Sequence, residues 1–370
     1  MLKFSDIVGQ EQIKEHLQRA LLDGRVSHAY IIDGARDSDK DMIADVVAAA
    51  IQCTDCATDA NGMPEPCGKC VSCIQAAAKA NGDIIYVTHE KPKSIGVGDI
   101  RLMRDDVAIK PYSCEHKVYI INDAELMTAA AQNALLKTLE EPPEYAVILL
   151  LADGVSNFLP TVMSRCVTLR MKPVPEEKIE EYCRRRIEEE ASEHPGEPVN
   201  TGAAEIKMAA GFSGGNAGRA LKILGSESFD AKRQAAAALF ENIGSRTGAD
   251  LVQAAQEFSE KKAAGKTSGK KQPKDAVAED DNNIVDTWKL TDFLEIWFHD
   301  VSIYKATGER DRIVFCDHTD GIIRISDRIS FEGLQNIRNA VGEYDKRRRA
   351  NVSDETALEM LLLSVRSQLH

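Results

Sequence analysis

Five of the nine cysteines lie within a short stretch of the chain. Cys67, Cys70 and Cys73 form a C-x-x-C-x-x-C motif, and either Cys53 or Cys56 could supply a fourth thiolate. Four thiolates give Zn²⁺ its preferred tetrahedral shell, and clustered cysteines in a large chain favour a metal site over a disulfide framework. An iron–sulfur cluster is the alternative, but the C-x-x-C-P ending of ferredoxin-type motifs is absent from the sequence. The spacing therefore predicts a structural zinc ion.

Residues 34–41 resemble a phosphate-binding loop of the pattern G-x-x-x-x-G-K-[ST]. The first glycine and the lysine are present as Gly34 and Lys40, but Asp39 replaces the second glycine and Asp41 replaces the hydroxyl residue. A side chain at position 39 hinders the close approach of the backbone to phosphate, and the three carboxylates of Asp37, Asp39 and Asp41 would repel it. The loop therefore has the position of a nucleotide site without its chemistry.

The second half of a nucleotide site is an apolar strand that ends in Asp-Glu, which bind Mg²⁺ and polarise water. The apolar run 118–121 ends instead in Asn122 and Asp123. An amide is a poor Mg²⁺ ligand, and aspartate is one methylene shorter than glutamate. Two degenerate halves in the correct order predict a nucleotide-binding fold that has lost its own activity. The alternative is a chance Gly…Lys loop beside an ordinary strand.

Ser164-Arg165-Cys166 follows the apolar run 145–151. Arg165 could act as an arginine finger that reaches a phosphate bound by a neighbouring subunit, where it would stabilise the transition state. Without further context it could equally be a surface arginine in a salt bridge.

The elements that would position these residues alternate between apolar strands and helices. Continuous apolar strands alternating with helices predict a parallel sheet covered on both faces. The expected strands are 28–33, 83–87, 117–121, 145–151 and 167–169, and the expected helices include 42–51 and 128–140.

After residues 173–175 the pattern becomes helical and charged, and the last expected helix covers 355–369. The pattern divides the chain into an α/β segment over 1–172, which contains the cysteine cluster at 53–73, a helical and charged segment over 173–225, and a helical segment over 226–370. Residues 260–283 combine a lysine-rich run with an acidic block, which is typical of a flexible, solvated insertion.

The chain has 370 residues, a net charge of −13 and 5% aromatic residues. The negative charge argues against an overall field that attracts DNA. No apolar run approaches the roughly 20 residues needed to cross a bilayer. We therefore expect a cytoplasmic protein.

Four segments together resemble the AAA+ clamp-loader subunits of bacterial DNA polymerase III. Residues 4–10 resemble the opening box of that family, residues 133–143 (NALLKTLEEPP) its signature helix, and residues 164–166 its SRC motif. The cysteine cluster resembles the zinc module that these subunits carry after the phosphate-loop helix. The resemblance implies an α/β AAA+ domain with a RecA-like parallel sheet and a zinc module, followed by a helical lid and an all-α C-terminal collar that joins subunits in a ring.

Within this family, a chain with an altered phosphate loop and without the Asp-Glu pair resembles the delta-prime class rather than the gamma/tau ATPase class. A third loss lies at the sensor 2 position, where the usual spacing from Gly215 reaches Gly218 instead of Arg219. The resemblance implies a stator that hydrolyses no ATP itself and presents Arg165 to ATP bound by a gamma/tau subunit. It also implies gamma/tau and delta subunits as partners, with the sliding clamp and primed DNA contacted through the complex.

The resemblance further implies Cys53, Cys67, Cys70 and Cys73 as zinc ligands, because a cysteine at the end of the phosphate-loop helix is the usual fourth ligand. Cys56 remains an alternative, since the spacing from 53 to 67 is longer than usual in the family. Two other functions are open. One is a divergent gamma/tau-like ATPase with weak activity of its own, and the other is a zinc-dependent DNA-binding adaptor.

Overall fold

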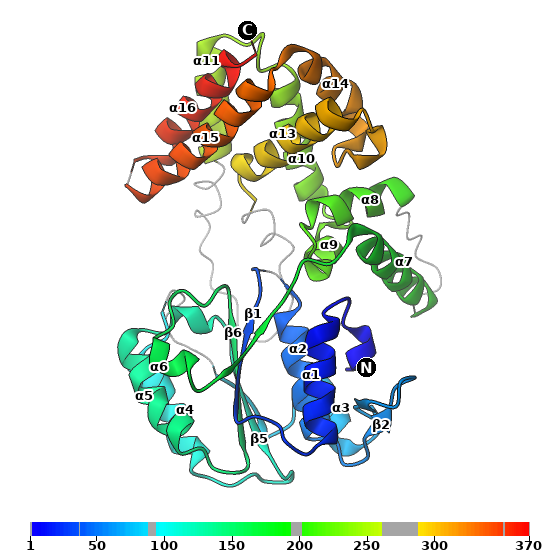
Figure 1. Ribbon diagram of the computed structural model, residues 1–370, viewed down its shortest axis with the longest axis vertical. Helices are drawn as coiled ribbons and strands as arrows, with labels where there is room; N and C mark the ends of the chain where they lie inside the picture. The colour runs from blue at the N-terminus through cyan, green and yellow to red at the C-terminus, as the bar shows by residue number, and fades with distance from the viewer. Residues whose placement is uncertain are drawn as a thin grey trace, which may run out of the picture. The chain divides into compact units, whose positions relative to one another are not determined.

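The computed structural model describes residues 2–36, 38–87, 94–193, 202–260, 288–350 and 352–369. The chain divides into two compact units (Figure 1). The first contains Met1–Arg185 and Gly214–Arg219, and the second contains Arg186–Ser213 and Ala220–His370.

The first unit is built on a five-stranded sheet in the order β4-β5-β6-β1-β7. Every pairing in this sheet is parallel. The two central strands are buried along almost their whole length, as expected for apolar runs in a parallel sheet. The strands are β1 (Ala29–Asp33), β4 (Ile84–Val87), β5 (Lys117–Ile121), β6 (Ala146–Ala152) and β7 (Val167–Arg170).

Helices cover both faces of this sheet (Figure 1). Successive residues of β1 point to opposite faces, so Tyr30 and Ile32 belong to one hydrophobic cluster and Ile31 belongs to the other. The first face carries α1 (Glu11–Leu22), α2 (Lys40–Ile51) and α3 (Val71–Ala77), and the second carries α4 (Val97–Val107), α5 (Ala129–Glu140) and α6 (Pro160–Met163). The predicted parallel α/β class is confirmed.

A small antiparallel hairpin lies between α2 and α3 in the chain. It consists of β2 (Ala57–Thr58) and β3 (Pro64–Glu65). The sequence did not predict this hairpin, because strands of two residues leave no periodic signal.

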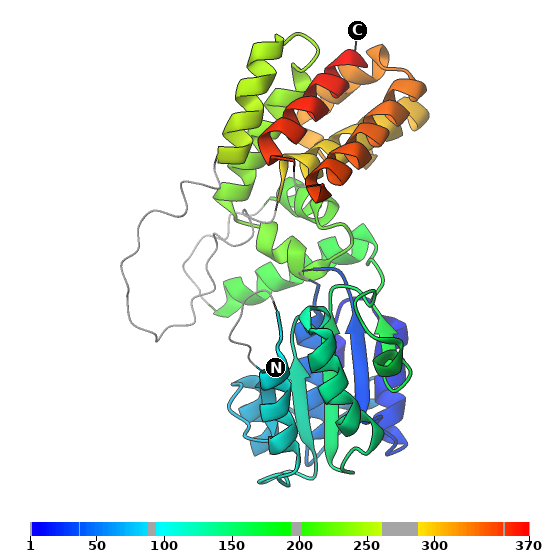
Figure 2. The same cartoon turned by 90° about the vertical axis from the view of Figure 1, so that its left-hand side faces the viewer.

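The second unit is helical, as predicted. Aromatic rings dominate its core: Phe315 packs edge-on against Phe212 and Trp297, with ring centroids 4.9 and 5.0 Å apart. Figure 2 shows α15 and α16 side by side. From α7, within which the first unit ends, the helices are α7 (Glu176–Glu193), α8 (Ala203–Phe212), α9 (Ala217–Ile223), α10 (Glu227–Glu241), α11 (Gly248–Glu260), α13 (Leu290–Thr307), α14 (Thr319–Arg328), α15 (Phe331–Arg349) and α16 (Asp354–Ser367).

Ala209 and Phe212 of α8 belong to the same hydrophobic cluster as α10 and α13. The structure divides the chain into two units, so the predicted division into a lid over 173–225 and a collar over 226–370 stays a prediction. The predicted insertion 260–283 lies outside the described residues after Glu260. None of the described helices is long and apolar enough to cross a bilayer.

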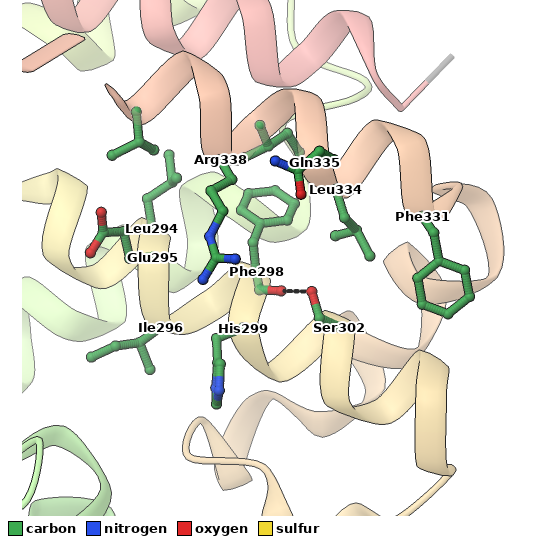
Figure 3. A pocket seen from close by; sticks show the side chains of 12 residues that line it. Leu294, Glu295, Ile296, Phe298, His299, Ser302, Phe331, Leu334, Gln335 and Arg338 are labelled. Atoms are coloured by element: carbon green, nitrogen blue, oxygen red, sulfur yellow. Dashed lines mark hydrogen bonds between the residues drawn. The ribbon is translucent and has the colours of Figure 1, made fainter. Parts of the chain in front are cut away.

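A cavity of about 640 Å³ lies in the second unit between α13 and α15 (Figure 3). Its walls are largely apolar, and Phe331 at one end is 60% exposed. On the side formed by α13, the Ser302 hydroxyl donates to the carbonyl of Phe298 at 2.7 Å.

Candidate nucleotide and metal sites

The degenerate phosphate loop lies where a parallel sheet normally binds ligands. β1 leads through Gly34 into the loop, and α2 begins at Lys40. Because β1, β5 and β6 are neighbouring parallel strands, their carboxyl ends bring Lys40, Asn122 and Asp153 to the same edge. The predicted residues therefore gather as a nucleotide site would.

The loop lysine is engaged by the protein itself. Lys40 is 8% exposed, and its ammonium forms an ion pair with the Asp153 carboxylate. The same ammonium donates to the carbonyl of Gly34 at 3.1 Å. In an active phosphate loop the lysine instead neutralises the phosphates. Sequence reasoning missed Asp153, although an acidic residue directly after a buried strand is a visible signal.

Backbone N–H groups of the loop are also hydrogen-bonded within the loop itself. The Ser38 N–H donates to the carbonyl of Ala35 at 3.1 Å, and the Lys40 N–H donates to the carbonyl of Ser38 at 2.7 Å. Such N–H groups bind the anion in a phosphate loop. Here these two are satisfied within the loop, which leaves them no donor capacity for phosphate.

Gly34 packs closely against two side chains in the ligand-free structure. A Cβ atom at this position would lie 2.6 Å from the sulfur of Met171 and 2.7 Å from the Ser38 hydroxyl. The glycine of the motif is therefore explained by the contact with the segment after β7.

The space beside the loop is small. A cavity of about 80 Å³ lies between the loop, the segment after β7 and residues 214–217. Small-molecule sites usually enclose about 300–1,000 Å³. A nucleoside triphosphate would need the loop to open.

The charges around this space are unfavourable for phosphate. Desolvation, followed by the negative charges of Asp45 and Asp123, raises the pKa of Asp41. Asn122 and Asp123 follow β5 and are exposed, and Asp123 adopts a left-handed backbone conformation with φ of 50°. Asp39 and Asp41 flank Lys40 directly in the sequence. Of these carboxylates, Asp39 lines the small cavity, where Lys172 is the neighbouring cation.

At the predicted sensor 2 position, Arg219 is bound to the phosphate loop. Its guanidinium donates to the carbonyl of Arg36 at 2.9 Å, and its backbone N–H donates to the side-chain oxygen of Asn216 at 3.1 Å. Gly215 has φ of +83°, and a Cβ there would lie 2.5 Å from Pro173. Gly218 falls within α9 and offers no side chain.

Arg165 lies at the surface and is held in place. Its guanidinium forms an ion pair with Glu140, the last residue of α5, at 2.9 Å. It also donates to the carbonyl of Thr161 at 2.9 Å. About a third of its side chain is exposed (35%), so it is accessible to another molecule. Sequence reasoning missed Glu140 as its partner.

Four cysteine sulfurs come together. Those of Cys53, Cys67, Cys70 and Cys73 all lie within 4.8 Å of one another. A tetrahedral zinc ion with bonds of about 2.3 Å requires sulfur atoms about 3.8 Å apart, so a small contraction would complete the shell. The Cys67 and Cys73 sulfurs are already 4.0 Å apart. This thiol set fits zinc.

Local backbone geometry supports a thiolate at Cys70, whereas burial raises the pKa of Cys73. The turn after Cys67 uses Gly68 with φ of 69°, and Cys70 caps α3 by accepting the Cys73 N–H at 3.4 Å. Burial acts to raise the pKa of Cys70, but N–H donation from Cys73 and Thr54 lowers it to about 6.

Cys56 lies outside this group. Its thiol donates to the carbonyl of Ala50 at 3.7 Å. Desolvation and then the neighbouring Cys53 sulfur raise the pKa of Cys56 to about 12. Cys56 therefore remains a protonated hydrogen-bond donor, whereas Cys53 belongs to the cluster.

Comparison with known proteins assigns the first unit. Residues 9–175 match the family described as DNA polymerase III, delta subunit. DNA polymerase III subunit tau of Bacillus subtilis is 36% identical over 177 residues, which are 48% of this chain and 30% of that protein. The tau subunit of Escherichia coli is 32% identical over 191 residues, 52% of this chain and 29% of that protein.

The chain thus spans less than a third of the length of these two relatives. Among solved structures, a gamma subunit-related protein from Thermotoga maritima aligns over 96% of this chain and 99% of its own at 19% identity. Its TM-score of 0.40 is too low to bear on function. The first unit, which contains the degenerate loop, is thus similar to bacterial DNA polymerase III subunits.

Proposed function

We propose that the chain is a non-hydrolysing clamp-loader subunit of the delta-prime type. Its partners would be the gamma/tau ATPase and delta subunits in the bacterial cytoplasm, and through them the sliding clamp and primed DNA. In this proposal the chain stabilises the complex and completes a neighbour's active site, while its own site binds no ATP for hydrolysis.

The observation that carries this proposal is the ion pair between Lys40 and Asp153 inside a closed loop. ATP would have to take Lys40 from Asp153, which would leave a partly solvated carboxylate without its cation. It would also have to open a space of about 80 Å³ and bind beside Asp39 and Asp41. All three requirements oppose nucleotide binding.

Arg165 supports the second half of the proposal. It is exposed, cationic and fixed by Glu140 and the Thr161 carbonyl, so little conformational entropy is lost when it meets a phosphate. In the proposed complex it contacts ATP bound by a gamma/tau subunit and stabilises the charge that develops during hydrolysis. The residues for the chain's own site are lost, and the residue for a neighbour's site is kept.

The four-cysteine cluster would hold a structural Zn²⁺. The ion would join the end of α2, through Cys53, to the start of α3, through Cys70 and Cys73. Its role would be to fix the hairpin insertion against the sheet domain.

Replacing Arg165 by alanine tests the finger role. We expect the reconstituted complex to form as before and its ATP hydrolysis to fall by roughly 10-fold or more, because a finger supplies up to 10³–10⁵-fold in related reactions. Arg19→Ala is the matched control, since Arg19 is an exposed arginine in the same unit, paired with Glu15. Unchanged hydrolysis in an intact Arg165→Ala complex would rule out the finger.

The second candidate is a divergent gamma/tau-like ATPase, which the names of the relatives favour. In that case Lys40 would leave Asp153 when ATP binds, and Asp123 would hold Mg²⁺. Turnover by the isolated chain that disappears in Lys40→Met would support this candidate.

A further inference from the structure

The segment Ser164-Arg165-Cys166 joins the short helix α6 to strand β7. Figure 1 shows α6 beside α5, and the two helices contact each other. The Arg165 N–H donates to the carbonyl of Val162 at 3.1 Å, and Cys166 packs against the hydrophobic cluster that lies between the sheet and α5. Because the backbone on both sides of Arg165 is held in this way, side-chain contacts decide where its guanidinium lies.

One nitrogen of the guanidinium, Nη1, is hydrogen-bonded twice. It donates to the carbonyl of Thr161 at 2.9 Å and to the hydroxyl oxygen of Ser164 at 3.2 Å. The Ser164 hydroxyl donates in turn to the same Thr161 carbonyl at 3.1 Å. These three contacts form a closed triangle, and they use both N–H groups of Nη1.

The opposite edge of the guanidinium is formed by Nε and Nη2. Among the described residues, the one polar contact at this edge is the ion pair between Nη2 and Glu140 at 2.9 Å. The side chains of Arg165 and Glu140 are 35% and 50% exposed, and ion pairs that are this exposed contribute little to stability. A phosphate group carries more negative charge than a carboxylate, so it can replace Glu140 at this edge without disturbing the contacts of Nη1.

The orientation of a guanidinium decides how it meets a phosphate. Arginine binds phosphate through two parallel N–H groups on one edge of a flat group, so a rotated plane loses one of the two contacts. A hydroxyl that fixes Nη1 therefore also fixes the direction of the Nε–Nη2 edge.

We propose that Ser164 is a positioning residue for the arginine finger: its hydroxyl holds Nη1 and keeps the Nε–Nη2 edge for the phosphate of a neighbouring subunit. This inference rests on the proposed finger role of Arg165. Ser164 acts through Arg165 and not through a contact of its own with ATP, which gives the serine of the motif a function beside that of the arginine.

Steady-state ATP hydrolysis by the reconstituted complex tests this proposal, with kcat and KM measured separately. For Ser164→Ala we expect kcat to fall by about three- to tenfold with KM unchanged, because a hydrogen bond that orients the transition-state contact is lost. Ser164→Thr keeps the hydroxyl and should stay within about twofold of the wild type. Ser156→Ala is the matched control and should have no effect, since Ser156 is an exposed serine of the same unit.

A double variant separates positioning from a purely structural role. Because Ser164 acts through Arg165, a complex with both Ser164→Ala and Arg165→Ala should hydrolyse ATP no more slowly than one with Arg165→Ala alone. Wild-type kcat in Ser164→Ala, or a further loss in the double variant, would overturn the positioning role and leave the finger role intact. Wild-type hydrolysis in Arg165→Ala would instead overturn the finger role, and the positioning role with it.

Discussion

At the scale of single residues, the lysine of the degenerate phosphate loop forms an ion pair with Asp153. The sequence alone predicted that Gly34 and Lys40 would begin a loop and a helix at the sheet edge, and the structure has this arrangement. It could not predict the pairing of Lys40 with Asp153, since the two residues are 113 positions apart. Nor could it predict that Gly34 is needed for contact with Met171.

Lys40→Met should therefore destabilise the ligand-free protein. Asp153 is 27% exposed, so partial solvation moderates the loss, and we expect a decrease of roughly 1–3 kcal/mol in the free energy of unfolding. Urea unfolding of wild type and variant, without nucleotide, measures it. Adding Asp153→Asn to Lys40→Met should restore part of the loss, because the unpaired charge is then removed. Equal stability of Lys40→Met and wild type would show that the ion pair has no structural role.

At the scale of elements, the strands and most helices of the first unit followed from the periodicity of apolar residues. The hairpin did not, and this hairpin decides the fourth thiol of the cysteine cluster. The pairing of Ala57 with Glu65 turns the chain back, and the Cys67 N–H then reaches the Cys53 sulfur at 3.4 Å. Spacing left Cys53 and Cys56 open because this return path is invisible in the sequence.

Serine substitutions at the two positions should consequently differ. We expect Cys53→Ser to lose most of its zinc and Cys56→Ser to keep a stoichiometric amount, as measured by atomic emission of the purified proteins. A structural zinc site contributes directly to folding, so chelation should lower the thermal midpoint of wild type and of Cys56→Ser. Zinc loss from Cys56→Ser, with retention in Cys53→Ser, would contradict the cluster.

At the scale of the whole molecule, the alternation of apolar runs and helices predicted the parallel sheet, and the lack of such runs later predicted the helical second unit. The predicted division into three domains did not follow from this alternation, because the boundary between lid and collar depends on which helices share a core. Phe212 of α8 packs on Phe229 and Phe315 within the second unit. Long-range packing of this kind leaves no periodic signal in the sequence.

The central proposal concerns the whole chain: its first unit resembles clamp-loader subunits, and we propose that its own phosphate loop binds no nucleotide. Titration of Mg-ATP into the isolated chain at about 100 µM, followed by calorimetry, tests this most directly, since even roughly millimolar binding begins to show at that concentration. We predict no saturable heat, with Lys40→Met indistinguishable from wild type. Micromolar binding that Lys40→Met abolishes would contradict the claim and favour a gamma/tau-like ATPase.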